Sequence, residues 1–267
     1  MTRPILPNSN TRIIAIANQK GGVGKTTTAI NLGTALAAVN QKVLIFDMDP
    51  QGNASTGLGI AQSQRSKNSY HVLINKTHLY ETILETCIPS MDIVPSGIDL
   101  SGAEIELVDV QDREICLRQA LAVSSIEYDY ILIDCPPSLS LLTINALTAA
   151  QAVLVPLQCE FFALEGVSQL MKTIEGVKQK FNPGLEIQGI ILTMFDNRNN
   201  LSSAVAEDVR AYFGDKVYET VIPRNVKVSE APSFGRPVVV YDLKCAGSEA
   251  YLNLAGEIIH RERRINA

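Results

Sequence analysis

A glycine-rich run ending in lysine and threonine carries the clearest chemistry of this chain. The run is Lys20-Gly21-Gly22-Val23-Gly24-Lys25-Thr26-Thr27. It follows an apolar stretch and opens a stretch with helical character. A turn of this kind at a helix N-terminus directs backbone N–H groups at an anion, and the helix dipole favours negative charge. We expect Lys25 to reach the terminal phosphates of a nucleotide and the Thr26 hydroxyl to ligate Mg²⁺.

The run departs from the standard phosphate-loop pattern at one position. The pattern G-x-x-x-x-G-K-[ST] requires Gly at position 19, where this chain has Gln19. A second lysine, Lys20, lies inside the loop instead. Two lysines in one phosphate loop indicate that one of them serves a different nucleotide.

Aspartates end two other apolar stretches. Asp47 and Asp49 follow Leu44 to Phe46, and their spacing directs both side chains to the same side of an extended chain. Such a carboxylate could orient an attacking water or hold a magnesium-bound water, although D-x-D-P also occurs as an ordinary turn. Asp134 ends the apolar run from Tyr130, which is the Walker B pattern for a carboxylate that holds Mg²⁺ through water.

Short β-branched runs alternate with helical patterns and must position these groups. We expect strands at 12–18, 42–47, 92–95, 130–134, 152–157, 187–194, 216–221 and 238–241. We expect helices at 26–38, 112–124, 141–149, 165–181, 201–212 and 248–263. This alternation predicts an α/β fold with a mostly parallel twisted sheet of about seven to eight strands and helices on both faces. Together with the phosphate loop, it indicates a fold like that of the P-loop NTPases. In such a sheet, ligands bind beyond the carboxyl ends of the strands.

No linker or repeat divides the chain, so we expect a flexible tail over 1–11 and a single domain over 12–264. The polar stretch 63–78 is interpreted as a surface excursion. The N-terminal stretch is short and polar, and no apolar run reaches membrane-spanning length, so we expect a cytoplasmic protein. The five cysteines are scattered without a C-x-x-C pair, which indicates neither a zinc site nor a disulfide framework.

The formal charge of the 267-residue chain is −5, which gives no global reason to bind nucleic acid. The excess of acid is uneven, however. Residues 1–194 hold 13 Lys and Arg against 18 Asp and Glu, whereas residues 195–267 hold 10 of each. A basic patch in the last quarter of the chain is therefore compatible with a negative net charge of the whole chain.

With Lys20, the aspartates and the phosphate loop in place, the chain resembles the ParA/Soj family of partitioning ATPases, which belongs to the deviant Walker A class. The resemblance spans nearly the whole chain. The segments that carry it are 17–28, 47–53, 134–139, 158–166 (Gln158-Cys159-Glu160-Phe161-Phe162-Ala163-Leu164-Glu165-Gly166) and 222–233. The segments after residue 157 are the more discriminating, because related ATPases share the phosphate loop but not these.

The resemblance implies that two subunits enclose two ATP molecules with Mg²⁺. The signature lysine, here Lys20, then crosses to the phosphates of the partner subunit, where a cation stabilises developing charge as an arginine finger does. Asp49 matches the residue that positions the attacking water, and Asp47 and Asp134 match residues near the magnesium shell. Pro223 and Asn225 match the segment that closes over the adenine.

The resemblance also implies that the ATP-bound homodimer binds double-stranded DNA without sequence preference, which requires phosphate contacts. Arg198, Arg224 and Lys227 match the DNA-contacting positions, and Lys227 stands where the family more often has Arg. A ParB-like centromere-binding partner is expected to stimulate hydrolysis and release the dimer. The protein would then be associated with the nucleoid.

Three other functions on the same scaffold stay open from the sequence. A MinD-like membrane-cycling ATPase needs an amphipathic C-terminal anchor, and 252–264 is partly amphipathic, although its apolar residues suit a core helix. An electron-transfer protein like the nitrogenase iron protein needs cluster-binding cysteines, for which Cys87 and Cys135 are the candidates. A metabolic enzyme is the last possibility, but no small-molecule site beyond the nucleotide is recognisable.

Overall fold

A parallel sheet with helices on both faces forms the protein, in a computed structural model that describes residues 11–160 and 163–265. Within these residues, seven strands form one sheet: β1 (Arg12–Ile16), β2 (Val43–Asp47), β3 (Leu84–Glu85), β4 (Met91–Val94), β5 (Tyr130–Asp134), β6 (Ala152–Gln158) and β7 (Glu186–Thr193). Their order is β3-β4-β2-β5-β1-β6-β7, and β3 alone among them pairs antiparallel, with β4. The predicted fold class is confirmed.

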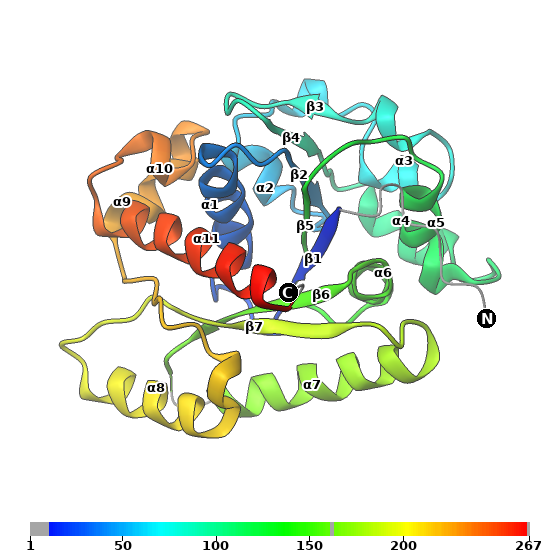
Figure 1. Ribbon diagram of the computed structural model, residues 1–267. Coiled ribbons are helices and arrows are strands. Elements are labelled where there is room, and N and C mark those ends of the chain that lie inside the picture. The colour runs from blue at the N-terminus through cyan, green and yellow to red at the C-terminus, as the bar shows by residue number, and fades with distance from the viewer. Residues whose placement is uncertain (1–10, 161–162, 266–267) are drawn as a thin grey trace.

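Two apolar clusters lie on the two faces of this sheet. Helices cover both faces (Figure 1). One is covered by α3 (Ser69–Leu73), α4 (Leu100–Glu106), α5 (Cys116–Ala122), α6 (Leu141–Ala149), α7 (Ala163–Lys180) and α8 (Asn200–Phe213). The other is covered by α1 (Lys25–Ala38), α2 (Asn53–Gly57), α9 (Val226–Glu230), α10 (Val238–Tyr241) and α11 (Ala246–Ile265). Strands buried on both faces are nearly all apolar, which is why their sequences lack alternation.

The prediction of a strand at 216–221 is wrong. This segment follows a 3-10 turn at Gly214–Lys216 and runs along β7, where Val217 forms only an isolated bridge to Ile190. The backbone N–H groups of Glu219 and Thr220 donate to the carboxylate of Glu257 on α11, at 3.0 and 3.1 Å. Because that side chain takes their hydrogen bonds, a continuous ladder with β7 does not form.

The prediction of a strand at 238–241 is also wrong, since these residues form helix α10. Pro237 precedes the helix, and the N–H of Val238 donates to Oδ1 of Asn31 on α1 at 2.7 Å. Val238 and Val239 are buried against the α1 face of the sheet. Tertiary packing has overridden the β preference of a Val-rich run, which measures fit to a pleated surface more than a backbone preference.

The stretch 63–78 is not a surface excursion as predicted. It contains α3, whose Val72 and Leu73 are buried in the core, and Asn68 caps that helix by accepting from the N–H of Tyr70. Arg65, ahead of α3, is also buried. The polar composition of the stretch hid these contacts. Of the expected tail, Thr11 is buried and donates to the carbonyl of Tyr128, and residues 1–10 lie outside the described residues.

Candidate nucleotide site

The glycine-rich run forms a turn between β1 and α1. Gly22 and Gly24 have φ of +74° and +89°, a left-handed conformation that glycine adopts without steric cost. Gly24 is the N-cap of α1 and provides no side-chain cap, so the first N–H groups of the helix are free to meet an anion. Thr193 fixes the turn from β7, because its hydroxyl donates to the carbonyl of Val23 at 2.8 Å.

The two lysines of this turn point to different places. Lys25 is buried, and its Nζ donates to the carbonyl of Lys20 at 3.0 Å. Burial lowers the pKa of Lys25, and the charge of Asp134 opposes that shift. The Lys20 side chain is 43% exposed and forms an ion pair with Glu160, which follows β6. Only Lys25 therefore directs its charge into the site of its own chain.

The sheet register brings the predicted carboxylates to the turn. β5 lies between β1 and β2, and Asp134 is paired with Ile16 on one side and with Asp47 on the other. The three strands end at the same edge, where the phosphate turn begins. Asp49 follows β2 by two residues and lines the same pocket as Lys25. The sequence-predicted groups are thus brought together from three separate segments.

Asp134 is a fully buried carboxylate, and neither of its oxygens has a hydrogen-bond partner among the described residues. Burial raises the pKa of Asp134 well above its ordinary value, and the neighbouring Asp47 adds to this rise. Thr26 lies near enough to favour the charged form, although its hydroxyl does not reach either oxygen with hydrogen-bond geometry. A buried carboxylate without partners suits a position that a cation or its water would complete.

Asp47 has a different environment. Its Oδ2 accepts from the N–H and the hydroxyl of Ser55, at 2.9 and 2.7 Å, and its Oδ1 accepts from the N–H of Asp49 at 3.2 Å. Burial raises the pKa of Asp47, and these hydrogen bonds oppose the rise. The carboxylate therefore fixes the turn after β2 in this state, and its predicted place in the magnesium shell stays a prediction.

A pocket of about 450 Å³ lies at the turn. It is lined from the phosphate turn, from Asp49 to Gly57, and from Pro137, Met194 and the segment 232–238. The sequence-predicted residues in its lining are Gly21, Gly22, Gly24, Lys25, Thr26, Thr27 and Asp49. In the described part of the chain, no group of three or more His, Cys, Asp or Glu side chains is arranged to hold Mg²⁺. Mg²⁺ in phosphate sites uses one or two carboxylates with waters and phosphate oxygens, so the donor set fits it.

Sequence reasoning missed part of this lining. Pro232, Arg236, Pro237 and Val238 close one side of the pocket, whereas the predicted Pro223 and Asn225 are not part of the lining. Instead, Pro223 bridges to Phe195, and Asn225 caps α9 through the N–H groups of Lys227 and Val228. Met194 also lines the pocket with φ of +51°, a strained value for a non-glycine residue that only the structure reveals.

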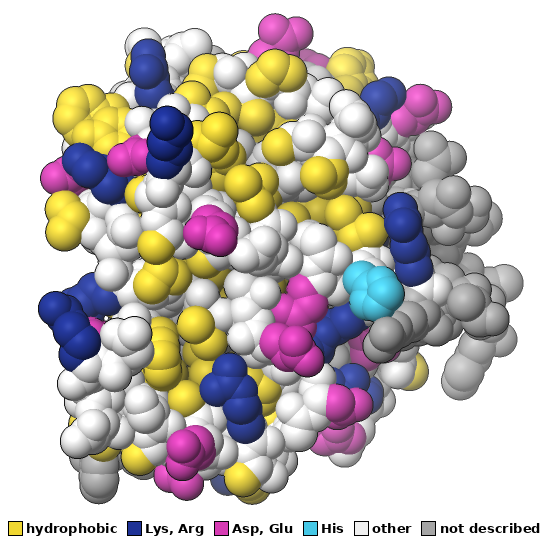
Figure 2. Space-filling model, turned by 60° about the vertical axis from the view of Figure 1, so that its left-hand side comes forward, with side chains coloured by type: hydrophobic (Ala, Val, Ile, Leu, Met, Phe, Trp, Pro, Cys, Tyr) yellow, Lys and Arg dark blue, Asp and Glu magenta, His cyan; other side chains and the backbone are white. Residues whose placement is uncertain are grey.

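The predicted DNA-contacting residues lie on two adjacent loops. Phe195 bridges to Pro223, so the loop that carries Arg198 runs beside Arg224. Arg198 donates to both oxygens of Asp196 at 2.9 Å, and this contact lowers the pKa of Asp196 to about 2, with a smaller contribution from Arg224. Lys227 forms an ion pair with Glu230 at 3.0 Å. Figure 2, in which the α9 and α10 side is turned forward, shows Lys and Arg interspersed with Asp and Glu.

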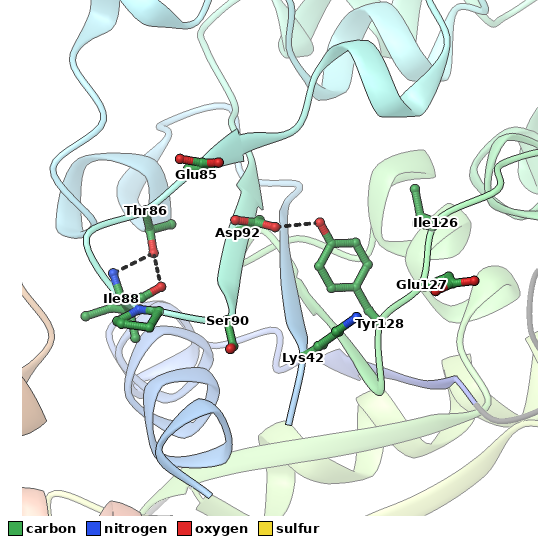
Figure 3. Close-up of a pocket in the computed structure, with 10 residues that line it drawn as sticks. Lys42, Glu85, Thr86, Ile88, Ser90, Asp92, Ile126, Glu127 and Tyr128 are labelled. Atoms are coloured by element: carbon green, nitrogen blue, oxygen red, sulfur yellow. Dashed lines mark hydrogen bonds between the residues drawn. The ribbon is translucent and has the colours of Figure 1, made fainter. Parts of the chain in front are cut away.

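A second pocket, of about 440 Å³, lies at the opposite edge of the sheet (Figure 3). Lys42, Ser90 and Tyr128 stand in the loops that enter β2, β4 and β5, and the Tyr128 hydroxyl donates to Asp92 at 2.7 Å. Its charged lining is Glu85, Asp92, Glu127 and the single cation Lys42. This acidic lining at the amino ends of the strands does not suit a triphosphate, which leaves the first pocket as the nucleotide site.

Known proteins match this chain along most of its length. The model of the AAA_31 family, described as an AAA domain, matches residues 11–187. The chromosome partitioning protein ParA of Caulobacter vibrioides is 63% identical over 94% of this chain and 95% of that protein. The sporulation initiation inhibitor protein Soj of Bacillus subtilis is 53% identical over 92% and 98%. The chain belongs to the ParA/Soj family of partitioning ATPases.

A solved structure supports the fold of this family member. The cobyrinic acid a,c-diamide synthase from Mycobacterium smegmatis, with bound ADP and magnesium, is 37% identical, covers 95% of this chain and 96% of its own, and superposes with a TM-score of 0.84. The same protein has been solved with a bound ATP analogue and magnesium. ParA/Soj membership makes the protein an ATPase, and this neighbour agrees with that family on the P-loop fold.

The C-terminal helix of this family member is tied to the sheet. Glu262 on α11 accepts from the Tyr130 hydroxyl at 2.5 Å and from Nε of Arg12 at 3.1 Å. Leu254 and Ile258 of the same helix are fully buried. Between residues 11 and 265, leaving aside 161 and 162, no helix is long and apolar enough to cross a membrane. The apolar side of α11 packs on the sheet, as the sequence favoured.

The two cysteines considered as ligands of an iron–sulfur cluster gain no support from the fold. Cys135 is buried in the core next to Asp134, and burial raises the pKa of its thiol, whereas Cys87 is exposed. Cys135 follows β5, while Cys87 follows β3 at the edge of the sheet. Within one chain the two thiols therefore belong to different parts of the sheet.

Two residues of the family segment 158–166, Phe161 and Phe162, lie outside the described residues.

Proposed function

We propose that this ATPase is a partitioning switch, in which ATP with Mg²⁺ drives a sandwich homodimer that binds DNA without sequence preference. A ParB-like partner would stimulate hydrolysis, and the separated subunits would release the DNA. The observation that carries the proposal is the direction of Lys20. Its ammonium is paired with Glu160 and is absent from the lining of its own pocket. A lysine inside a phosphate turn that does not face its own nucleotide is available to a second subunit.

The roles of the site residues follow from their positions. The free N–H groups at the start of α1 and the Lys25 ammonium would hold the phosphates, and Thr26 and Asp134 would hold Mg²⁺. The ion neutralises charge on the phosphate oxygens. Asp49 lines the pocket and would orient the attacking water, and Lys20 of the other subunit would stabilise the charge that develops on the transferred phosphoryl group.

The DNA surface would use Arg198, Arg224 and Lys227. The first and last of these form ion pairs at the protein surface, where such pairs add little to stability, so a DNA phosphate can replace the carboxylate. A dimer doubles the number of contacts, which accounts for DNA binding that depends on ATP. On this proposal the protein is associated with the nucleoid.

Sedimentation of the Lys20→Ala protein tests the assembly step. We expect this variant to bind ATP with nearly unchanged affinity, because Lys20 does not line the pocket, and to remain monomeric with ATP and Mg²⁺. Lys180→Ala, at the exposed end of α7, is the matched control and should dimerise like the wild type. ATP-dependent dimers of Lys20→Ala equal to those of the wild type would contradict the proposed role in trans.

A further inference from the structure

Arg65 is a buried arginine that has no role in the function proposed above. It is 6% exposed, and it lies in the polar stretch ahead of α3. Its guanidinium donates to four neighbours. These are the carbonyl of Ile60 (2.6 Å from Nη2 and 3.2 Å from Nε), the carbonyls of Gly52 and Ser96 (each 3.3 Å from Nη1) and the hydroxyl of Thr56 (2.9 Å from Nη2).

All four acceptors are neutral, and no carboxylate of the described residues forms a salt bridge with Arg65. Burial lowers the pKa of Arg65, and the charge of Asp47 opposes that shift without a direct ion pair. An apolar side chain in the same space would leave these acceptors without a donor. The fork of donors therefore ties together the segments that carry these acceptors.

The contacts of Arg65 converge on the turn that follows Asp49. Gly52 is the N-cap of α2, with φ of +60°, and its N–H donates to the carbonyl of Asp49 at 2.8 Å. A Cβ atom on Gly52 would lie 2.5 Å from Nη1 of Arg65, so the guanidinium is packed directly against this backbone. Asn53 and Thr56, at the start and near the end of α2, line the nucleotide pocket.

A second route joins Arg65 to the strand end of β2. The carbonyl of Ser96 accepts from Arg65, and the N–H of Ser96 donates to Oγ of Ser55 at 2.9 Å. The Ser55 hydroxyl in turn donates to Asp47 at 2.7 Å. Arg65 thus contacts the Asp49 turn directly on its α2 side and is linked to Asp47, on the other side, through Ser96 and Ser55.

We propose that Arg65 is a positioning residue for the ATPase reaction, and that its guanidinium holds the segment 49–57 so that the Asp49 carboxylate and the α2 side chains face the bound nucleotide. This inference rests on the proposed role of Asp49 in orienting the attacking water. The phosphate turn has its own fixing contacts from Thr193 and does not touch Arg65. Loss of Arg65 should therefore affect the chemical step more than nucleotide binding.

The test compares Arg65→Met with Arg65→Lys in the full chain. Met keeps most of the volume without the donors, and Lys keeps the charge but cannot reach four acceptors. We expect kcat to fall on the order of 10-fold to 100-fold in Arg65→Met, since misplacement of a catalytic group by about 1 Å has this effect. The KM for ATP should change less than about threefold, and Arg65→Lys should recover part of kcat. Arg118→Met, which loses a hydrogen bond to the Phe181 carbonyl far from the pocket, is the control.

Hydrogen exchange measured by mass spectrometry gives a second readout without turnover. Arg65→Met should exchange faster over 49–61 and unchanged over 18–30, with and without ATP. Equal exchange over 49–61, or unchanged kcat in the folded variant, would overturn the positioning role. If the wild type does not hydrolyse ATP, the proposed function fails by itself, and the exchange data still decide whether Arg65 holds the segment. If Arg65→Met does not fold, Arg65→Lys and Arg65→Gln undergo the same two measurements.

Discussion

Nζ of Lys25 donates a hydrogen bond of 3.0 Å to the backbone carbonyl of Lys20, so the two lysines of the phosphate turn meet through the main chain of one and the side chain of the other. The Lys25 ammonium lies over the turn that would receive a phosphate, while the Lys20 ammonium lies outside it against Glu160. One loop thus presents two cations to two different surroundings. This difference predicts that removal of each lysine impairs a different step of the protein's activity.

Removing Lys25 should weaken nucleotide binding itself. A hydrogen bond to a charged group contributes ~1.5–3 kcal/mol, so Lys25→Ala should lose roughly 10-fold to 100-fold in ATP affinity. Isothermal titration calorimetry with ATP and Mg²⁺ measures this, and Lys20→Ala is the internal comparison. Equal affinities of the two variants would show that Lys25 does not contact the phosphates.

Replacing Asp134 should stabilise the metal-free protein and abolish its response to Mg²⁺. The carboxylate is fully buried without hydrogen-bond partners and lies beside Asp47, so its charge is unfavourable until a cation arrives. Asp134→Asn should gain on the order of 1 kcal/mol in unfolding free energy without metal. Urea unfolding with and without Mg²⁺ and ATP measures both effects. A variant that is less stable than the wild type, or still gains stability from Mg²⁺, contradicts this role of Asp134.

The DNA surface should reveal itself in the salt dependence of binding. The double variant Arg198→Ala/Lys227→Ala should bind non-specific DNA more weakly in the ATP state, with the slope of log K against log salt reduced by about 1 for each lost phosphate contact. Mobility shifts over a salt series measure this. Lys172→Ala/Lys180→Ala on exposed positions of α7 is the matched control. If the double variant binds as well as the wild type, these residues are not the DNA surface.

Asp196 competes with DNA phosphates for Arg198, so Asp196→Asn should tighten DNA binding a few-fold at low salt. The same pair can be followed by pH. Contact with Arg198 depresses the pKa of Asp196 to about 2, so the contribution of the pair is present above the ordinary value of 3.8 and is lost as the pH falls through about 2. In Arg198→Ala, carboxyl NMR should show the pKa back near 3.8, and Arg224→Ala should shift it less. The reverse order would contradict the geometry.

Glu262 should matter for stability, because it anchors α11 to the sheet. Glu262→Ala leaves Arg12 and Tyr130 without one of their partners, and we expect a loss of ~1–3 kcal/mol in unfolding free energy. Glu249→Ala, exposed on the same helix, should cost far less unfolding free energy.

The wild type should also fail to sediment with anionic liposomes in the presence of ATP. ATP-dependent sedimentation would favour the membrane-cycling alternative instead.

Sequence patterns were reliable where the chain is buried on both faces and continuous. The apolar runs of β1, β2, β5 and β6 could be predicted because a central parallel strand needs little beyond its own residues. The segments 216–221 and 238–241 have the same β-branched character, yet Glu257 and Asn31 take their backbone N–H groups. Those partners are distant in sequence, so no local pattern could reveal them.

The sequence by itself determined the chemistry of the phosphate turn, because glycine conformations, a lysine and a threonine at fixed spacing create that site within a single loop. It also determined that aspartates end the neighbouring strands. The tertiary structure decided which of these groups share a site, since only the strand order sets Asp134 between Ile16 and Asp47. It also decided that Lys20 faces Glu160, that the segment 232–238 rather than Pro223 lines the pocket, and that Arg65 is buried beneath the Asp49 turn. Direction and burial depend on contacts between distant segments, and spacing along the chain does not encode them.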